Sequence, residues 1–164
     1  MALMQWNEQL QLGLGKMDKT HEEFVSHYNA VVEAAPEQFL ARLDDFIAHT
    51  EEHFDQENRW MEQVNFPGCH RAEHDRVLVV MRDVRNRIER GDAFLGKRLM
   101  EELPAWFDNH VSGMDAALAF HLDSIGFDVE TGVITPPEGD CSGSANAGGC
   151  ACTSAPARAG AEQV

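Results

Sequence analysis

The sequence predicts an all-α fold: an antiparallel, up-down-up-down four-helix bundle with an N-terminal arm and a disordered C-terminal tail. Apolar residues recur with the period of a helix, and no strand pattern competes with them. One such run contains Val77, Leu78, Met81, Val84 and Ile88. Short connections join the long periodic segments, and such connections are typical of antiparallel neighbouring helices.

The first two helices are expected on either side of a proline. The first should start at Asp18 or Lys19, with Asp18 as its N-cap, and end at Ala35. The second should start at Pro36, because proline is favoured at the first helical position, and end near Val64.

The last two helices are expected after the turn "NFPGC". The third should run from His70 to Arg90, where Gly91 provides a left-handed C-terminal cap. The fourth should span residues 94–124. Pro104 lies inside it and should kink or restart the helix, because proline lacks the backbone N–H.

The chain should form one folded domain, residues 1–127, followed by a tail, residues 128–164. Its 164 residues match the length of one ordinary domain. All aromatic residues and histidines precede residue 128, and about half of the tail is Gly, Ala, Ser and Pro, so the tail cannot offset its ordering entropy. Cys141, Cys150 and Cys152 lie in this tail. They belong either to a flexible appendage or to a site for Cu(I) or thiol exchange.

Composition excludes several classes of partner. The chain has 28 acidic and 13 basic residues and a formal net charge of −15, which argues against binding to nucleic acid or to an anionic membrane surface. It shows neither a signal peptide nor an apolar run long enough to span a membrane. We therefore expect a cytoplasmic protein without membrane insertion.

Two pairs of side chains flank the "NFPGC" turn: His53 with Glu57, and His70 with His74. Residues four apart on a helix project from one face, so each pair can grip one ion. Imidazole and carboxylate together suit Fe, Zn, Mn or Cu. The alternative for any single pair is a solvated surface pair. Several such pairs on inward faces without a metal would leave buried polar groups unsatisfied, at about 1–3 kcal/mol each.

The outer helices carry further candidate ligands. His21 lies near the start of the first helix, and His110 and Asp115 lie on the fourth. Five residues along an α-helix correspond to a rotation about 140° away from a common face. Spacing alone therefore does not place His110 and Asp115 at one site.

These motifs resemble those of the bacterial hemerythrins, which are non-haem di-iron, oxygen-binding four-helix bundles. The resemblance covers residues 5 to about 127. The segment "QWNEQLQLGLGKMDKTH" is similar to the family's tryptophan-led arm and first-helix histidine. The segments "HFDQENRWM", "HRAEH" and "WFDNHVSGMD" are similar to its HFxxE, HxxxH and HxxxxD motifs.

The resemblance implies two non-haem irons with a bridging oxo or hydroxo group. The implied ligands are His70, His74 and His110 on one iron, His21 and His53 on the other, and Glu57 and Asp115 bridging both. The iron with two histidines then keeps one open position, at which O₂ binds reversibly by resemblance.

The apolar shell around the open position should keep out water and reductants. The candidates for the O₂ pocket are Phe54, Trp106, Phe107 and Val111, and plain core packing is the alternative for each. Phe107 stands where the family resemblance leads us to expect leucine. His49 should lie at the surface or behind the ligands.

The expected function is reversible O₂ binding for carriage, storage or delivery, by a monomer that is not an enzyme. Its expected partners are O₂ and either an O₂-consuming enzyme or a reductase. One alternative is an O₂ or redox sensor, which would need a separate output partner. Another is a di-iron oxidase or peroxidase, or an iron store, although the paired ExxH motifs of such proteins are absent.

Overall fold

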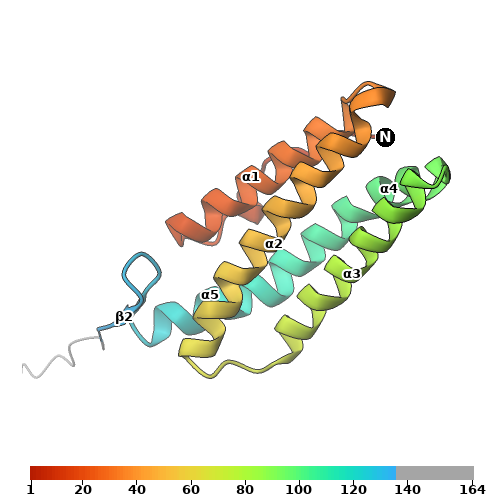
Figure 1. Ribbon diagram of the computed structural model, residues 1–164. Helices are drawn as coiled ribbons and strands as arrows, with labels where there is room; N and C mark the ends of the chain where they lie inside the picture. The colour runs from red at the N-terminus through yellow and green to blue at the C-terminus, as the bar shows by residue number, and fades with distance from the viewer. Residues whose placement is uncertain (136–164) are drawn as a thin grey trace, which may run out of the picture.

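The computed structural model describes residues 1–135 and confirms the predicted four-helix bundle with its N-terminal arm (Figure 1). The bundle helices are α1 (Gly15–Val32), α2 (Phe39–Gln63), α3 (Cys69–Glu89), α4 (Ala93–His110) and α5 (Ala116–Ser124). A π-helical turn, Val111–Asp115, joins α4 to α5, so these two helices form the fourth rod of the bundle. The short elements are two 3₁₀ turns, Glu8–Leu10 and Pro36–Gln38, and the strands β1 (Phe127–Asp128) and β2 (Val133–Ile134).

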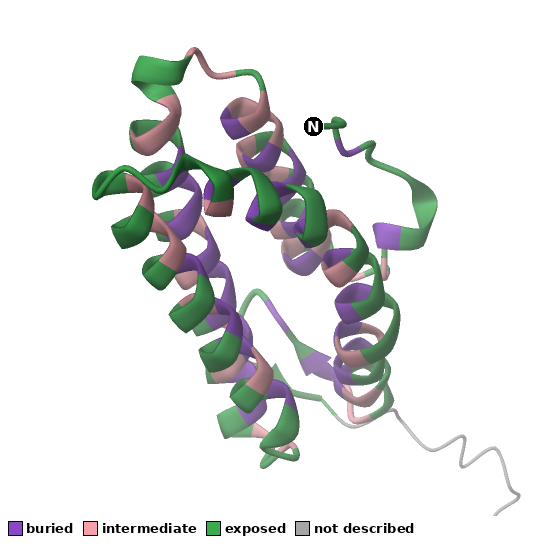
Figure 2. Cartoon of the chain, turned by 90° about the vertical axis from the view of Figure 1, so that its right-hand side faces the viewer, coloured by how far each residue is buried: buried purple, intermediate pink, exposed green. Residues whose placement is uncertain are grey.

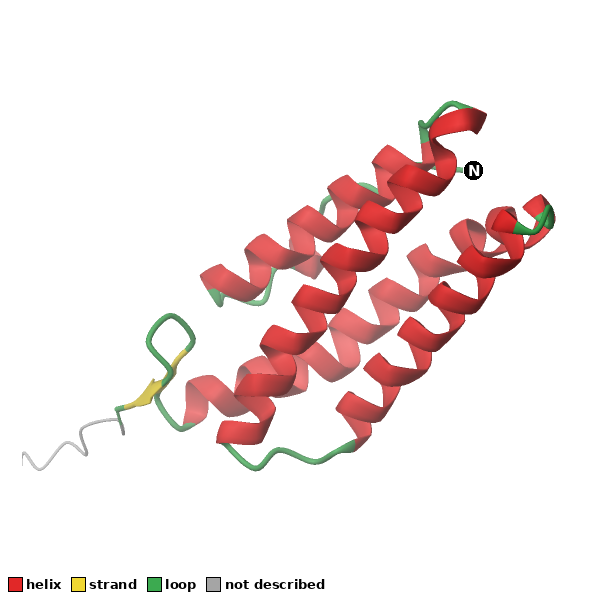
Figure 3. Ribbon diagram, in the orientation of Figure 1, coloured by secondary structure: helices red, strands yellow, loops and turns green. Residues whose placement is uncertain are grey.

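Successive rods of the bundle run in opposite directions, and each rod packs beside the next (Figures 1 and 3). The short turns between them leave no room for a crossover. No helix within residues 1–135 combines the length and apolar character needed to cross a membrane.

Buried residues line the inner face of every bundle helix (Figure 2). They form two apolar clusters, one containing Phe24, Phe46 and Leu103 and the other containing Trp60 and Leu122. A layer of buried polar residues lies between these clusters along the helices. Its members are His21, Thr50, His53, Glu57, His70, His74, His110 and Asp115.

The expected N-cap role of Asp18 is wrong, because α1 begins at Gly15. Asp18 lies in the first turn, and its carboxylate reaches back to the N-terminal arm. The Leu12 N–H donates to Asp18 Oδ1 at 2.6 Å, and the Gly13 N–H donates to Oδ2 at 3.0 Å. The side chain therefore caps backbone amides of the arm rather than those of the helix.

Pro104 does not restart the fourth helix, because α4 continues through it. A proline inside a helix leaves the carbonyl four residues earlier without its N–H partner, here the carbonyl of Met100. The Tyr28 hydroxyl of α1 donates to that oxygen at 2.6 Å. This hydrogen bond satisfies the freed acceptor and ties α1 to α4.

A β-hairpin follows α5, contrary to the expectation that no strand would form (Figure 3). Phe127 and Val129 are buried in the cluster that contains Trp60, and this packing accounts for the hairpin's position. Residues 128–135, which the sequence assigned to the tail, thus belong to the described fold. The rest of that tail, with Cys141, Cys150 and Cys152, lies outside the described residues.

Two phenylalanines provide a matched test of this core. Phe46 is fully buried and packs edge-on against Phe24 at 4.8 Å between ring centroids, whereas Phe94 is 66% exposed. Phe46→Ala should lower the free energy of unfolding by about 3–5 kcal/mol, because it leaves a cavity. Phe94→Ala should change it by less than about 0.5 kcal/mol. Urea denaturation measures both, and equal losses would contradict the assigned core.

Candidate metal centre

All seven predicted ligands lie in the buried polar layer, each at most 4% exposed. Their nitrogen and oxygen atoms form two groups, and within each group the atoms lie within 4.8 Å of one another. One group contains Glu57, His70, His74, His110 and Asp115, and the other contains His21, His53 and Glu57. The structure therefore brings together residues from all four rods of the bundle.

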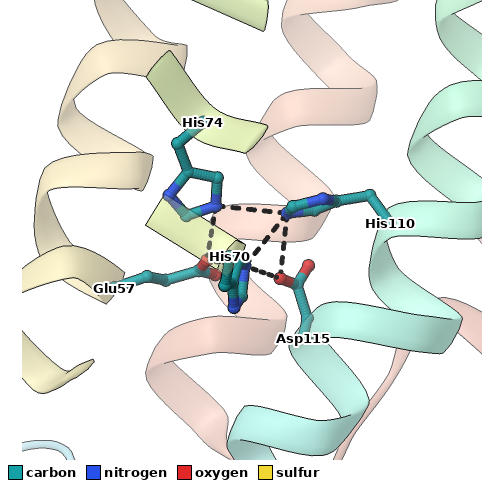
Figure 4. A group of neighbouring side chains, drawn as sticks. All are labelled: Glu57, His70, His74, His110 and Asp115. Carbon is teal, nitrogen blue, oxygen red and sulfur yellow. Dashed lines mark hydrogen bonds and ion pairs between the residues drawn. The ribbon is translucent and has the colours of Figure 1, made fainter. Parts of the chain in front are cut away.

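Three imidazoles converge in the larger group, which we call the three-histidine group (Figure 4). The Nε2 atom of His110 lies 3.2 Å from the Nε2 atoms of both His70 and His74. A single N–H can form a hydrogen bond between two of these nitrogens, but it cannot satisfy three nitrogens that face one point. Such convergence is typical of a metal site.

Each carboxylate presents one oxygen to each histidine group. Asp115 Oδ1 lies 3.0 Å from His70 Nε2, and Oδ2 lies 3.2 Å from His21 Nε2. Glu57 Oε2 lies 3.4 Å from His74 Nε2, and Oε1 lies 3.0 Å from His53 Nε2. Both carboxylates thus stand between the two groups, as ligands shared by two ions would.

The π-helical turn explains how His110 and Asp115 reach one site. His110 directly precedes that turn and Asp115 is its last residue, and Asp115 Oδ1 lies 3.1 Å from His110 Nε2. The 140° offset calculated above assumed a regular α-helix. A π-helical turn takes in one more residue, so side chains five apart face the same way, and such turns are frequent at functional sites.

Two hydrogen-bond acceptors orient His21 and His74 through their Nδ1 atoms. Neither acceptor was identified from the sequence. The Leu10 carbonyl oxygen lies 3.0 Å from His21 Nδ1, and Asn58 Oδ1 lies 3.0 Å from His74 Nδ1. A hydrogen-bond acceptor beside Nδ1 keeps the proton of the neutral imidazole on Nδ1. The Nε2 atom is then unprotonated and can bind a metal. Asn58 follows directly after Glu57, but α-helical spacing gives no sign that it faces α3.

The predicted pocket residues lie beside different ligands. Phe54 stacks on His74 with 3.9 Å between ring centroids, whereas Phe107 packs edge-on against His21 at 5.6 Å. Val111 is fully buried. Phe24, which the sequence analysis did not select, stacks on Phe107 at 4.0 Å.

Trp106 differs from the other pocket candidates because it also reaches the surface. Its indole stacks on His110 at 4.8 Å between centroids, and its Nε1–H donates to Glu73 at 2.8 Å. A hydrogen bond from Arg76, together with that from Trp106, lowers the pKa of Glu73 to about 2. Glu73 is therefore a carboxylate at neutral pH.

His49 lies behind the ligands and belongs to neither group. It stacks on His27 at 4.7 Å between centroids, and its Nε2 atom lies 3.3 Å from the Thr20 carbonyl oxygen. Burial and the neighbouring His53 and His27 lower the pKa of His49 to about 4.

A family model described as "Hemerythrin HHE cation binding domain" matches residues 12–119. The chain belongs to the hemerythrin family. It is 48% identical to the Bacteriohemerythrin of Ralstonia nicotianae over 130 residues, which cover 78% of this chain and 95% of that relative. It is 27% identical to that of Stenotrophomonas maltophilia, with coverage of 73% and 81%, and 25% identical to that of Methylococcus capsulatus, with coverage of 70% and 93%. No solved structure gave a significant match.

The electrostatics of this hemerythrin site fit a cation. Burial lowers the pKa of His21, but the nearby carboxylates of Asp115 and Glu57 outweigh it and raise the pKa to about 10. Burial raises the pKa of Glu57, but His53, His21 and His74 outweigh it and hold that pKa well below its usual value. A protonated His21 therefore balances buried negative charge that a metal ion would otherwise balance.

Several buried atoms of the site have no hydrogen-bond partner in the described part of the chain. They are His21 Nε2, Glu57 Oε2, both Asp115 carboxylate oxygens, and the Nδ1 atoms of His53, His70 and His110. Leaving such groups unpaired in a core is costly. The first four of these atoms point into the centre and fit metal coordination.

Asn58 provides a test of whether an acceptor at Nδ1 orients His74 for metal binding. Asn58→Ala should weaken divalent-cation binding about 10- to 100-fold, because the His74 ring loses the acceptor at Nδ1. Asn109→Ala is the matched control, since the exposed Asn109 amide donates only to the Ala105 carbonyl. Competition with a chelator measures both affinities. Equal affinities in the two variants would contradict a positioning role for Asn58.

Proposed function

We propose that this chain binds O₂ reversibly at two non-haem irons, for carriage, storage or delivery. Membership of the hemerythrin family and the buried histidine and carboxylate cluster support a metal-binding, oxygen-binding domain. The observation that supports two irons most strongly is the division of each carboxylate between the histidine groups, with one oxygen directed to each.

The proposed ligands divide into a set for each iron and a shared set. They are His70, His74 and His110 for the first iron, His21 and His53 for the second, and Glu57 and Asp115 for both. When bound, the irons would supply redox chemistry toward O₂.

The chain's own residues hold this centre and shield it. The Leu10 carbonyl accepts at His21 Nδ1, so the N-terminal arm orients a ligand of the second iron. Phe107 packs edge-on against His21, Phe24 stacks on Phe107, and the two rings exclude water from that side. Their apolar rings support reversible binding, because water promotes irreversible oxidation of such a centre and external reductants would consume O₂ there.

Metal content tests the ligand set. The full chain loaded anaerobically with Fe²⁺ should hold two irons, and His74→Ala should hold fewer, because its imidazole lies in the three-histidine group. His121→Ala should still hold two, since His121 belongs to neither group of possible ligands. Elemental analysis measures all three proteins. Equal iron in both variants, or a single zinc in the full chain, would contradict the assignment.

Reversibility tests the function itself. Anaerobic ferrous protein should develop new absorption bands on addition of O₂, and these bands should disappear when the gas is removed. Optical spectroscopy over several cycles measures the recovery. Irreversible oxidation with consumption of peroxide would instead favour a di-iron oxidase or peroxidase.

A further inference from the structure

A surface groove between α3 and α4 leads to the metal centre. It is lined by Val77, Val80, Met81, Leu99, Leu103 and Trp106, together with Arg76 and Glu102. Its volume is about 130 Å³. An engineered apolar cavity of about 150 Å³ binds benzene, so this open groove can take one ring of a flat aromatic molecule. We call it the α3–α4 groove.

Trp106 connects this groove to a proposed iron ligand. Its ring lines the groove and also stacks on His110, with 4.8 Å between centroids and 23° between planes. The hydrogen bond from its Nε1–H to Glu73 fixes the indole in this orientation. A molecule bound in the groove would therefore be separated only by the Trp106 indole from His110, a proposed ligand of the first iron.

The groove approaches the centre on the side of the first iron. Trp106 lies against His110, which we assign to the first iron, whereas Phe107 packs edge-on against His21, which we assign to the second. A donor in the groove could thus deliver an electron to the first iron through His110. Such a route would return iron that has become ferric to the ferrous state.

Charge favours a cationic occupant. The chain has a formal net charge of −15, which attracts cations over a distance. Among residues 1–135, Arg76 is the only cation that lines the groove, and its guanidinium is paired with Glu73. The remaining walls are mostly apolar, which suits a flat aromatic ring.

We propose that the α3–α4 groove is an electron-entry site, where a small cationic aromatic one-electron donor docks on Trp106 and reduces ferric iron through His110. This inference rests on the proposed di-iron function. Each donor loses one electron and each ferric ion gains one, so two donors restore a di-ferrous centre. The indole conducts the electron without being oxidised, and no covalent bond forms or breaks in it.

Val79 and Val80 provide a matched pair of variants. Val80 lines the groove and is 41% exposed, whereas its neighbour Val79 does not line it and is 63% exposed. Lysine at either exposed position adds the same charge. The methyl viologen radical cation should reduce the ferric, iron-loaded Val80→Lys protein about tenfold more slowly, because the new charge occupies the docking site. Val79→Lys should match the unmodified chain in stopped-flow kinetics.

A second measurement needs no iron. In the metal-free chain carrying Trp6→Phe, the methyl viologen dication should quench the fluorescence of Trp106, because Trp60 is only 5% exposed. Val80→Lys should weaken this quenching about tenfold, by the same repulsion. Val79→Lys should leave it unchanged.

Equal reduction rates in the two lysine variants would overturn the proposal. Weaker quenching in Val80→Lys without slower reduction would also overturn it, because the donor would then dock without delivering its electron there. Failure of the proposed function looks different, since the unmodified chain would lack iron or the oxygen-dependent bands before any donor is added.

Discussion

Burial of five imidazoles and two carboxylates at one level of a narrow bundle is the constraint on which the rest of this structure depends. These side chains face one another with several nitrogens and oxygens unpaired, and unpaired polar groups in a core cost about 1–3 kcal/mol each. Removing one partner from a buried charged set is costlier still. A metal ion is a common partner that resolves the conflict, and this couples metal binding to the stability of the fold.

The arrangement of the four rods and the N-terminal arm holds that polar layer in place. An apolar cluster lies on either side of it along the bundle, and each of the four rods supplies at least one proposed ligand. The N-terminal arm contributes through the carbonyl of Leu10, which orients His21, and through the amides of Leu12 and Gly13, which Asp18 caps. These hydrogen bonds therefore couple the position of the arm to the orientation of His21.

Sequence patterns predicted the four rods, because the rods follow helical periodicity. The same periodicity placed His53 with Glu57, and His70 with His74, on common faces, whereas the full set of proposed ligands rested on the family resemblance. The pattern failed where the backbone leaves the α-helical repeat. The π-helical turn Val111–Asp115 cannot be read from a period of 3.6 residues, so spacing alone did not place Asp115 with His110. A restart of the helix at Pro104 was also wrongly expected, because the hydroxyl that satisfies Met100 comes from Tyr28, far away in the chain.

Mössbauer spectroscopy of the iron-loaded, oxygenated protein tests the central claim most directly. Three histidines on one side and two on the other make the two proposed sites chemically different, while the shared carboxylates Glu57 and Asp115 couple them. The account predicts two distinct iron signals of equal area from a magnetically coupled pair. A single signal from an isolated high-spin ferric ion would contradict it.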